Sequence, residues 1–243
     1  RVDRGEYYLP TAENFPSEFL DSGAMTPVAE VSARDLATAI DWTKFAAVPR
    51  KQKGANSDLS SIHLEFGSSF VATATDGYQM SMGFFRCWSL AYDATLDLSS
   101  AIELGRTIES IGDLTANIGV AVDPAFLEFS QPSAFLFRVR PNKSPYPDLK
   151  PTVNGFLSES NHYWSLPIGP TITALSIAID YGAERVRFEL DVKSRSVVCR
   201  GESEWGRFES LLPLPDETFS GKGFTCNPKL LIEVLRAIPV GRH

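Results

Sequence analysis

The sequence has few of the residues from which enzyme sites are usually built. It holds three histidines and three cysteines in 243 residues, and Cys87, Cys199 and Cys226 lack the close pairing of a zinc or redox site. No HExxH, GxSxG or Walker A string occurs. Asp93 and Asp97, two acids before a predicted helix, are interpreted as helix-capping residues rather than an acid–base pair. The sequence thus predicts no catalytic residue, metal site or cofactor and disfavours an enzyme, although a site assembled across the fold stays open.

Long apolar runs are also missing. None approaches the roughly 20 residues of a membrane span, and the charged residues 1–6 do not resemble the start of a signal peptide. Because the cysteines are few, distant and odd in number, free thiols in a reducing cytoplasm are the plain interpretation. The net charge of −7 argues against coating nucleic acid by bulk attraction, but it leaves a local basic face open.

Four segments have apolar residues at helical spacing. They begin after Ser32, after Ser99 and Ser100, after Pro167 and at Asn227, so the starts lie 60 to 68 residues apart. Asn227 is a good N-cap, and Pro228 suits the first helical position. The apolar sets predicted to be buried are Leu36, Ile40 and Ala47; Ala101, Leu104, Ile108 and Ile111; Ile168, Ile172, Leu175 and Ile179; and Leu231, Val234, Leu235 and Ile238.

Between these segments the sequence alternates in the manner of strands. The predicted strands are 62–66, 70–74, 79–85, 126–129, 135–139, 186–190, 196–200 and 205–212. One helix followed by three or four antiparallel strands is the repeating unit, which predicts an α+β fold of duplicated half-domains. Residues 10–27 and 152–161, rich in Pro, Gly, Ser and Asn, are predicted linkers. Incomplete units at both ends lead us to expect a portion of a longer protein.

Three short strings stand in order on this repeat: ATDGYQM (74–80), YPD (146–148) and CNPKLL (226–231). Together with LPTAENFP (9–16), they resemble the bacterial DNA polymerase III β subunit, the replicative sliding clamp, over nearly the whole chain. The resemblance implies the DNA-clamp fold, with pseudo-symmetric half-domains. It implies that 1–22 is the end of a preceding clamp domain and a linker, 23–155 the second domain, and 156–243 an incomplete third domain.

The resemblance further implies a processivity factor in DNA replication, not an enzyme. In this family a ring-shaped homodimer of full-length subunits encircles duplex DNA without reading its sequence, and helices line the hole. The protein would then be cytoplasmic and nucleoid-associated, without membrane contact. The basic residues expected to face DNA are Lys44, Arg50, Lys51, Lys53, Arg106, Lys229 and Arg236. A divergent clamp-like scaffold that binds proteins without sliding on DNA is the alternative.

Clamps also hold short linear peptides from the polymerase III α subunit, the clamp loader and repair polymerases. By position, the resemblance assigns this pocket to Leu59, Thr75, Gly77, Tyr78, Gln79, Met80 and Pro147. Methionine is adaptable, which suits a site with several partners. Gln79 stands where many clamps have arginine and Pro151 where a basic residue is common, so we expect a different peptide specificity. Without the resemblance, Leu59 and Met80 would be assigned to the core, and 75–77 to a tight turn.

Overall fold

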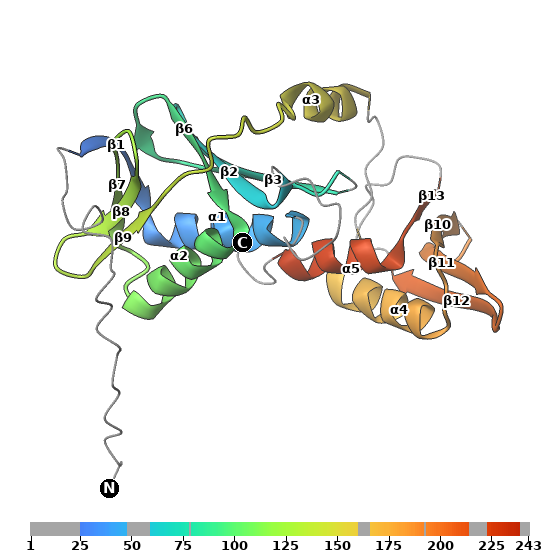
Figure 1. Ribbon diagram of the computed structural model, residues 1–243. Helices are drawn as coiled ribbons and strands as arrows, with labels where there is room; N and C mark the ends of the chain where they lie inside the picture. Colours follow the sequence, from blue (N-terminus) through green and yellow to red (C-terminus); the bar gives the residue numbers. More distant parts are fainter. Residues whose placement is uncertain are drawn as a thin grey trace, which may run out of the picture.

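The computed structural model describes residues 25–47, 59–77, 79–159, 166–191, 193–213 and 223–238, which form antiparallel sheets and helices (Figure 1). The helices are α1 (Ala33–Thr43), the 3-10 turn η2 (Lys44–Ala46), α2 (Leu98–Ile111), α3 (Lys150–Glu159), α4 (Ile168–Asp180) and α5 (Pro228–Ala237). The strands are β1 (Thr26–Ser32), β2 (Ser61–Phe66), β3 (Phe70–Thr75), β4 (Met80–Phe85), β5 (Trp88–Ser89), β6 (Tyr92–Asp97), β7 (Asn117–Val122), β8 (Leu127–Gln131), β9 (Phe135–Val139), β10 (Val186–Asp191), β11 (Ser196–Ser203), β12 (Gly206–Pro213) and β13 (Phe224–Cys226). The predicted α+β class is confirmed.

The first two sheets are built from two half-domains that exchange their first strands. The order β1-α1-β2-β3-β4 is repeated by β6-α2-β7-β8-β9. Yet β1 pairs with β7, and β6 pairs with β2, which gives the sheets β5-β1-β7-β8-β9 and β4-β3-β2-β6. Each half therefore depends on the other for a strand of its sheet, and the two halves form one body.

The third sheet follows the same plan. After α4 come β10, β11 and β12, and β13 pairs with β10 just before α5, in the order β12-β11-β10-β13. This repeats the arrangement of β4-β3-β2-β6, in which β6 pairs with β2 just before α2. Helices α1 and α2 pack against each other, and so do α4 and α5. The repeat predicted from helix spacing is therefore present in the fold.

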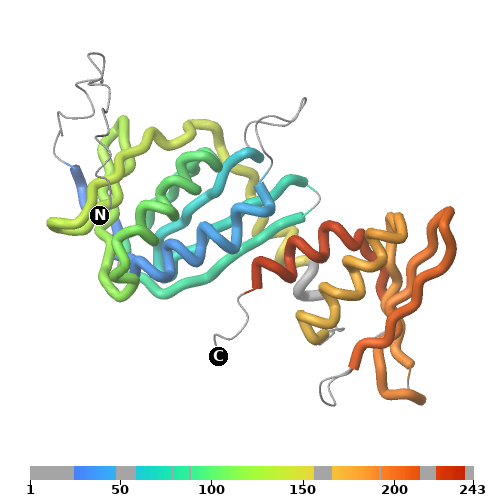
Figure 2. Tube along the Cα trace, turned by 90° about the horizontal axis from the view of Figure 1, so that it is seen from below, coloured from blue at the N-terminus to red at the C-terminus, as the bar shows by residue number. Residues whose placement is uncertain are grey.

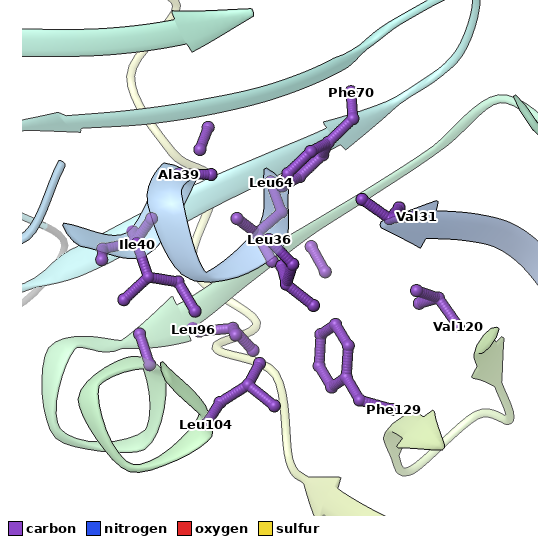
Figure 3. Packing of buried hydrophobic residues seen from close by; sticks show 14 of the residues in the cluster. Val31, Leu36, Ala39, Ile40, Leu64, Phe70, Leu96, Leu104, Val120 and Phe129 are labelled. Atoms are coloured by element: carbon purple, nitrogen blue, oxygen red, sulfur yellow. The ribbon is translucent and has the colours of Figure 1, made fainter. Parts of the chain in front are cut away.

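Two separate hydrophobic clusters hold these layers together. In the larger one, Leu36 and Ile40 of α1 and Leu104 of α2 meet strand residues from both sheets, such as Leu96 and Phe129 (Figure 3). The smaller cluster lies between α4, α5 and the third sheet. Full burial of one such side chain contributes about 1.5–3 kcal/mol.

Helices α1, α2, α4 and α5 lie along one side of the molecule (Figure 1). Viewed from that side, α1 and α2 stand in front of strands of the first two sheets, and α4 and α5 lie beside the third sheet (Figure 2). Helix α3 lies on the other side, beyond the sheet β4-β3-β2-β6 (Figure 1). The fold thus has a helical face and an outer sheet face.

The helix predictions need three local corrections. The second helix begins at Leu98, not after Ser100, because β6 runs directly into it and Leu98 N donates to Ser60 O at 3.1 Å. In the last helix the buried apolar residues are Ile232 and Leu235, whereas Ile238 lies beyond the helix end and is exposed. Ala47 is buried as predicted but follows η2 instead of belonging to α1.

The linker predictions were wrong where the structure describes them. Residues 152–159 of the second predicted linker belong to α3. Asp148 Oδ1 accepts a hydrogen bond from Lys150 N at 3.1 Å, and Pro151 falls in the first turn, where proline is tolerated. Thr26 and Pro27, the end of the first predicted linker, lie in β1, and residues 10–24 are outside the described part. The predicted domain boundary at residue 155 falls within α3.

Candidate functional site

The segment from Thr75 to Met80 is a turn that holds its own shape. Thr75 Oγ1 donates to Gln79 O at 2.8 Å and accepts from Gly77 N at 3.0 Å. Asp76 Oδ1 accepts from Gln79 N at 2.7 Å, which confirms Asp76 as a turn residue. Gly77 has φ +86°, a backbone conformation that favours glycine. These hydrogen bonds join the two strand ends of the β3–β4 hairpin.

Several residues of the predicted pocket gather around this turn. Thr75 and Met80 are paired across β3 and β4, and Leu59 Cδ1 lies 4.0 Å from the point where a Cβ on Gly77 would be. Met80 is half-buried, which fits neither a core residue nor a free surface residue. Tyr78 lies outside the described residues. Pro147 is exposed and lines a neighbouring cavity with Met82, which sits two residues along β4 from Met80.

Gln79 makes contacts that the sequence did not predict. Its Nε2 donates to Phe45 O at 3.1 Å and to Glu233 Oε2 at 3.5 Å. The turn is thus linked both to η2 and to α5, across 154 residues of sequence. No local sequence pattern predicts a contact between residues so far apart in the chain. Met82 was also missed, although its spacing of two from Met80 places it on the same face of the strand.

On the same sheet face, the rings of His63 and Tyr146 stack with centroids 4.9 Å apart and an interplanar angle of 1°. His63 Nδ1 lies 3.0 Å from Thr95 Oγ1. Burial lowers the pKa of His63 below its ordinary 6.5, and this outweighs the opposing effect of the carboxylates of Glu65 and Asp93. Burial also raises the pKa of Tyr146 to about 12. Both rings are therefore uncharged at neutral pH.

This histidine predicts a pH dependence of stability. Because the folded pKa is below 6.5, the unfolded chain takes up the proton first as the pH falls. The free energy of unfolding should therefore decrease as the pH drops through 6.5 towards the folded pKa. His63→Gln, which keeps a polar side chain beside Thr95, should remove this part of the dependence. Urea unfolding of both proteins at about pH 8 and about pH 6 measures it. Equal pH dependence in the two proteins would contradict the assignment.

Two of the four predicted DNA-facing cations that the structure describes, Lys44 and Arg106, form ion pairs with acids on the helices. Lys44 forms an ion pair with Asp41, and Arg106 Nη1 lies 2.6 Å from Glu103 Oε1. Lys229 and Arg236 are exposed on α5, and Arg50, Lys51 and Lys53 lie outside the described residues. Helices α1, α2, α4 and α5 with η2 carry five basic and six acidic side chains. The described part of the helical face is therefore not a basic surface.

In the part of the chain that is described, we find little support for a cysteine nucleophile, a metal site or a membrane-spanning helix. Burial raises the pKa of Cys199 to about 12 and that of Cys226 to about 11, so both thiols are protonated at neutral pH and are poor nucleophiles. Among the described residues, no group of three His, Cys, Asp or Glu side chains could hold a metal ion. No described helix is both long and apolar enough to span a bilayer.

Solved structures with the same arrangement are bacterial clamp proteins. The DNA polymerase III β subunit from Thermotoga maritima matches with a TM-score of 0.73 and 17% identity, over 94% of this chain and 60% of that chain. The DNA polymerase sliding clamps from Bacillus subtilis and Pseudomonas aeruginosa match with TM-scores of 0.72 and 0.71 and identities of 16% and 17%. These matches cover 96% and 89% of this chain and 58% and 59% of those chains.

The likeness is one of structure. No protein-family model and no curated protein matches the sequence. This chain spans about 60% of the length of the structures that it resembles. At these identities the shared property is the fold. The chain has the fold of the bacterial DNA polymerase III β subunits and sliding clamps.

Proposed function

We propose that this chain works, without catalysing a reaction, as a sliding clamp subunit that encircles duplex DNA and tethers partner proteins through short peptides. Residues 23–155 and 156–243 would be its second and third clamp domains. The observation that carries the proposal is the set of hydrogen bonds among Thr75, Asp76, Gly77 and Gln79, which lies beside half-buried Met80 on a clamp-like scaffold. A scaffold with adaptable apolar side chains suits several peptide partners.

The peptide site would lie at the end of the β3–β4 hairpin. Strand β4 is an edge strand of its sheet, and Met80, Met82 and Phe84 share its outer face. The two methionines are half-buried and Phe84 is 66% exposed. Apolar peptide side chains could bury this surface, while Gly77 leaves space beside Leu59. Polymerase, clamp-loader and repair-polymerase peptides are the partners that we propose, as the resemblance implies.

For DNA, the proposal depends on enclosure more than on charge. A closed ring retains a duplex by topology and needs only loose phosphate contacts, which do not depend on sequence. The layer of α1, α2, α4 and α5 along one side of the fold suits the inner wall of such a ring (Figure 2). Dimerisation of the full-length protein and association with the nucleoid belong to the same proposal.

One observation favours a second candidate function. Five basic and six acidic side chains on the helices with η2 give little attraction for phosphate. A clamp-like scaffold that gathers proteins without sliding on DNA would have no need of a basic face. Retention on circular DNA by the full-length protein after loading separates the two, because a scaffold of this second kind would not be retained.

Fluorescence anisotropy tests peptide binding directly. The probe is a labelled peptide from the C-terminal tail of a bacterial polymerase III α subunit. We expect saturable binding that Met80→Ala weakens about tenfold or more, since about 1.4 kcal/mol of apolar contact would be lost. Tyr78→Ala, at the remaining predicted position of the turn, should have a similar effect. Leu136→Ala, which truncates an exposed apolar residue on another sheet, should leave binding unchanged.

Two results would contradict the proposed peptide site. One is the absence of binding at protein concentrations well above about 100 μM, because any remaining contact would then contribute less than about 5.5 kcal/mol of binding free energy. The other is binding that Met80→Ala and Leu136→Ala weaken equally, because that would place the peptide elsewhere.

A further inference from the structure

The cavity lined by Pro147 and Met82 lies on the outer face of the sheet β4-β3-β2-β6, near the turn. Its volume is about 490 Å³, and residues 145–150 form one of its walls. Its floor includes His63, Thr73 and Met82, which stand opposite one another on β2, β3 and β4. The side chains of Tyr92 and Tyr146 add aromatic walls. The cavity can therefore surround the aliphatic part of a side chain.

The floor of this cavity holds a hydroxyl group without a partner. Thr73 is 2% exposed, and its Oγ1 makes no hydrogen bond in the structure. A buried hydroxyl left unpaired is unfavourable, and most such groups in folded proteins find a partner. Because Thr73 Oγ1 is almost completely covered, a polar group held in the cavity does not reach it, and this floor suits the aliphatic part of a side chain.

The charges of the residues that line the cavity determine whether it favours a positive or a negative ligand. Three carboxylates line the cavity, those of Glu65, Asp93 and Asp148, against the single ammonium of Lys150. That ammonium lies 2.5 Å from Glu65 Oε2 and is neutralised there. His63, whose pKa is lowered by burial, adds no positive charge at neutral pH. The remaining carboxylates, Asp93 and Asp148, favour a cation.

The position of the cavity indicates which molecule would supply the cationic group. Thr73 and Met82 are each two residues along their strands from Thr75 and Met80, a distance of about 7 Å. Pro147, which belongs to the predicted peptide pocket, also lines the cavity. A peptide that is anchored at Met80 and runs along this face would place a neighbouring side chain over the cavity.

We propose that this cavity binds a lysine or arginine side chain of a peptide docked at the 75–80 turn, an inference that rests on the proposed peptide binding. The aliphatic stem would lie against Met82 and the aromatic walls. The charged head would lie near the carboxylates of Asp93 and Asp148. The cavity would thus add a preference for basic residues to a site otherwise based on apolar contacts.

The test compares peptides that differ at one position. In the polymerase-tail peptide, each residue flanking the apolar anchor is replaced in turn by lysine or by norleucine, which has a similar stem without the charge. At low salt we expect one position at which lysine binds about fivefold more tightly than norleucine. Asp93→Asn should reduce this ratio to below about twofold. Glu184→Gln, an exposed acid in the third sheet's body, should leave it unchanged.

The outcomes separate this inference from the function on which it rests. If the peptides bind and Met80→Ala weakens them, but no position prefers lysine, the cavity proposal is wrong and the peptide site stands. A lysine preference that persists in Asp93→Asn overturns it as well. If no peptide binds to the wild-type protein, the proposed function fails, and the cavity proposal fails with it.

Discussion

Leu104→Ala is expected to lower the stability of the larger body, which contains the first two sheets with α1 and α2, by about 2–5 kcal/mol. It should leave the third sheet almost unaffected. Leu104 is fully buried between α1, α2 and the strands of both first sheets, so its truncation leaves a cavity that rigid neighbours cannot fill (Figure 3). Leu175, equally buried, belongs to the other hydrophobic cluster. Leu175→Ala should therefore destabilise the body that contains the third sheet and leave the larger body almost unaffected, because the two clusters share no buried residue.

Hydrogen exchange read by mass spectrometry distinguishes the two variants, since it reports protection segment by segment. In Leu104→Ala, protection should fall in β2, β3, β7 and β8 and stay unchanged in β10 and β11. Leu136→Ala, at an exposed position, serves as the control and should change little. Equal loss of protection in all three sheets would mean that the clusters unfold as one unit, against the predicted division into two domains.

The second large effect concerns DNA. The helical face has slightly more acidic than basic side chains, so we expect this chain to bind linear duplex DNA weakly. The double variant Glu103→Lys, Glu109→Lys would leave α2 with three basic side chains and no acidic one. If this face lies towards DNA, the affinity at low salt should rise about tenfold or more. The slope of log K against log salt should steepen by about 0.9 for each new phosphate contact.

A matched variant controls for total charge. Glu202→Lys, Glu204→Lys makes the same change of charge on and beside β11, in the third sheet. It should raise the affinity for DNA far less than the α2 variant. Equal gains from the two variants would mean that DNA responds to bulk charge, and the helical face would then have no special role. Filter binding or anisotropy at several salt concentrations measures both.

Much of the fold was predictable from local patterns. Ser32 caps α1 by accepting from Asp35 N at 3.1 Å, and Asn227 caps α5 by accepting from Lys229 N at 2.9 Å. Such caps and the apolar spacing after them depend on neighbouring residues, so they can be read from sequence. Helix α3 was missed because its Pro, Gly, Ser and Asn residues are typical of a linker.

Long-range pairing was not predictable in this way. The exchange of β1 and β6 between sheets joins residues that are 85 to 96 and 26 to 36 positions apart, and nothing in either strand specifies its partner. The same limit applies to the site. The turn at 75–80 follows from its glycine and aspartate, but the contact of Gln79 with Glu233 depends on how α5 is placed. The cavity at Thr73 requires the register of three strands.

The most direct test of the account is the hydrogen-exchange footprint of the polymerase-tail peptide on this chain. Bound peptide should slow exchange in the 75–80 turn, in β4 and in residues 145–150, and it should leave α2 and α4 unchanged. This pattern would locate partner binding on the outer sheet face of a clamp-like scaffold. Slower exchange on the helices with none at the turn, or no footprint at saturating peptide, would contradict it.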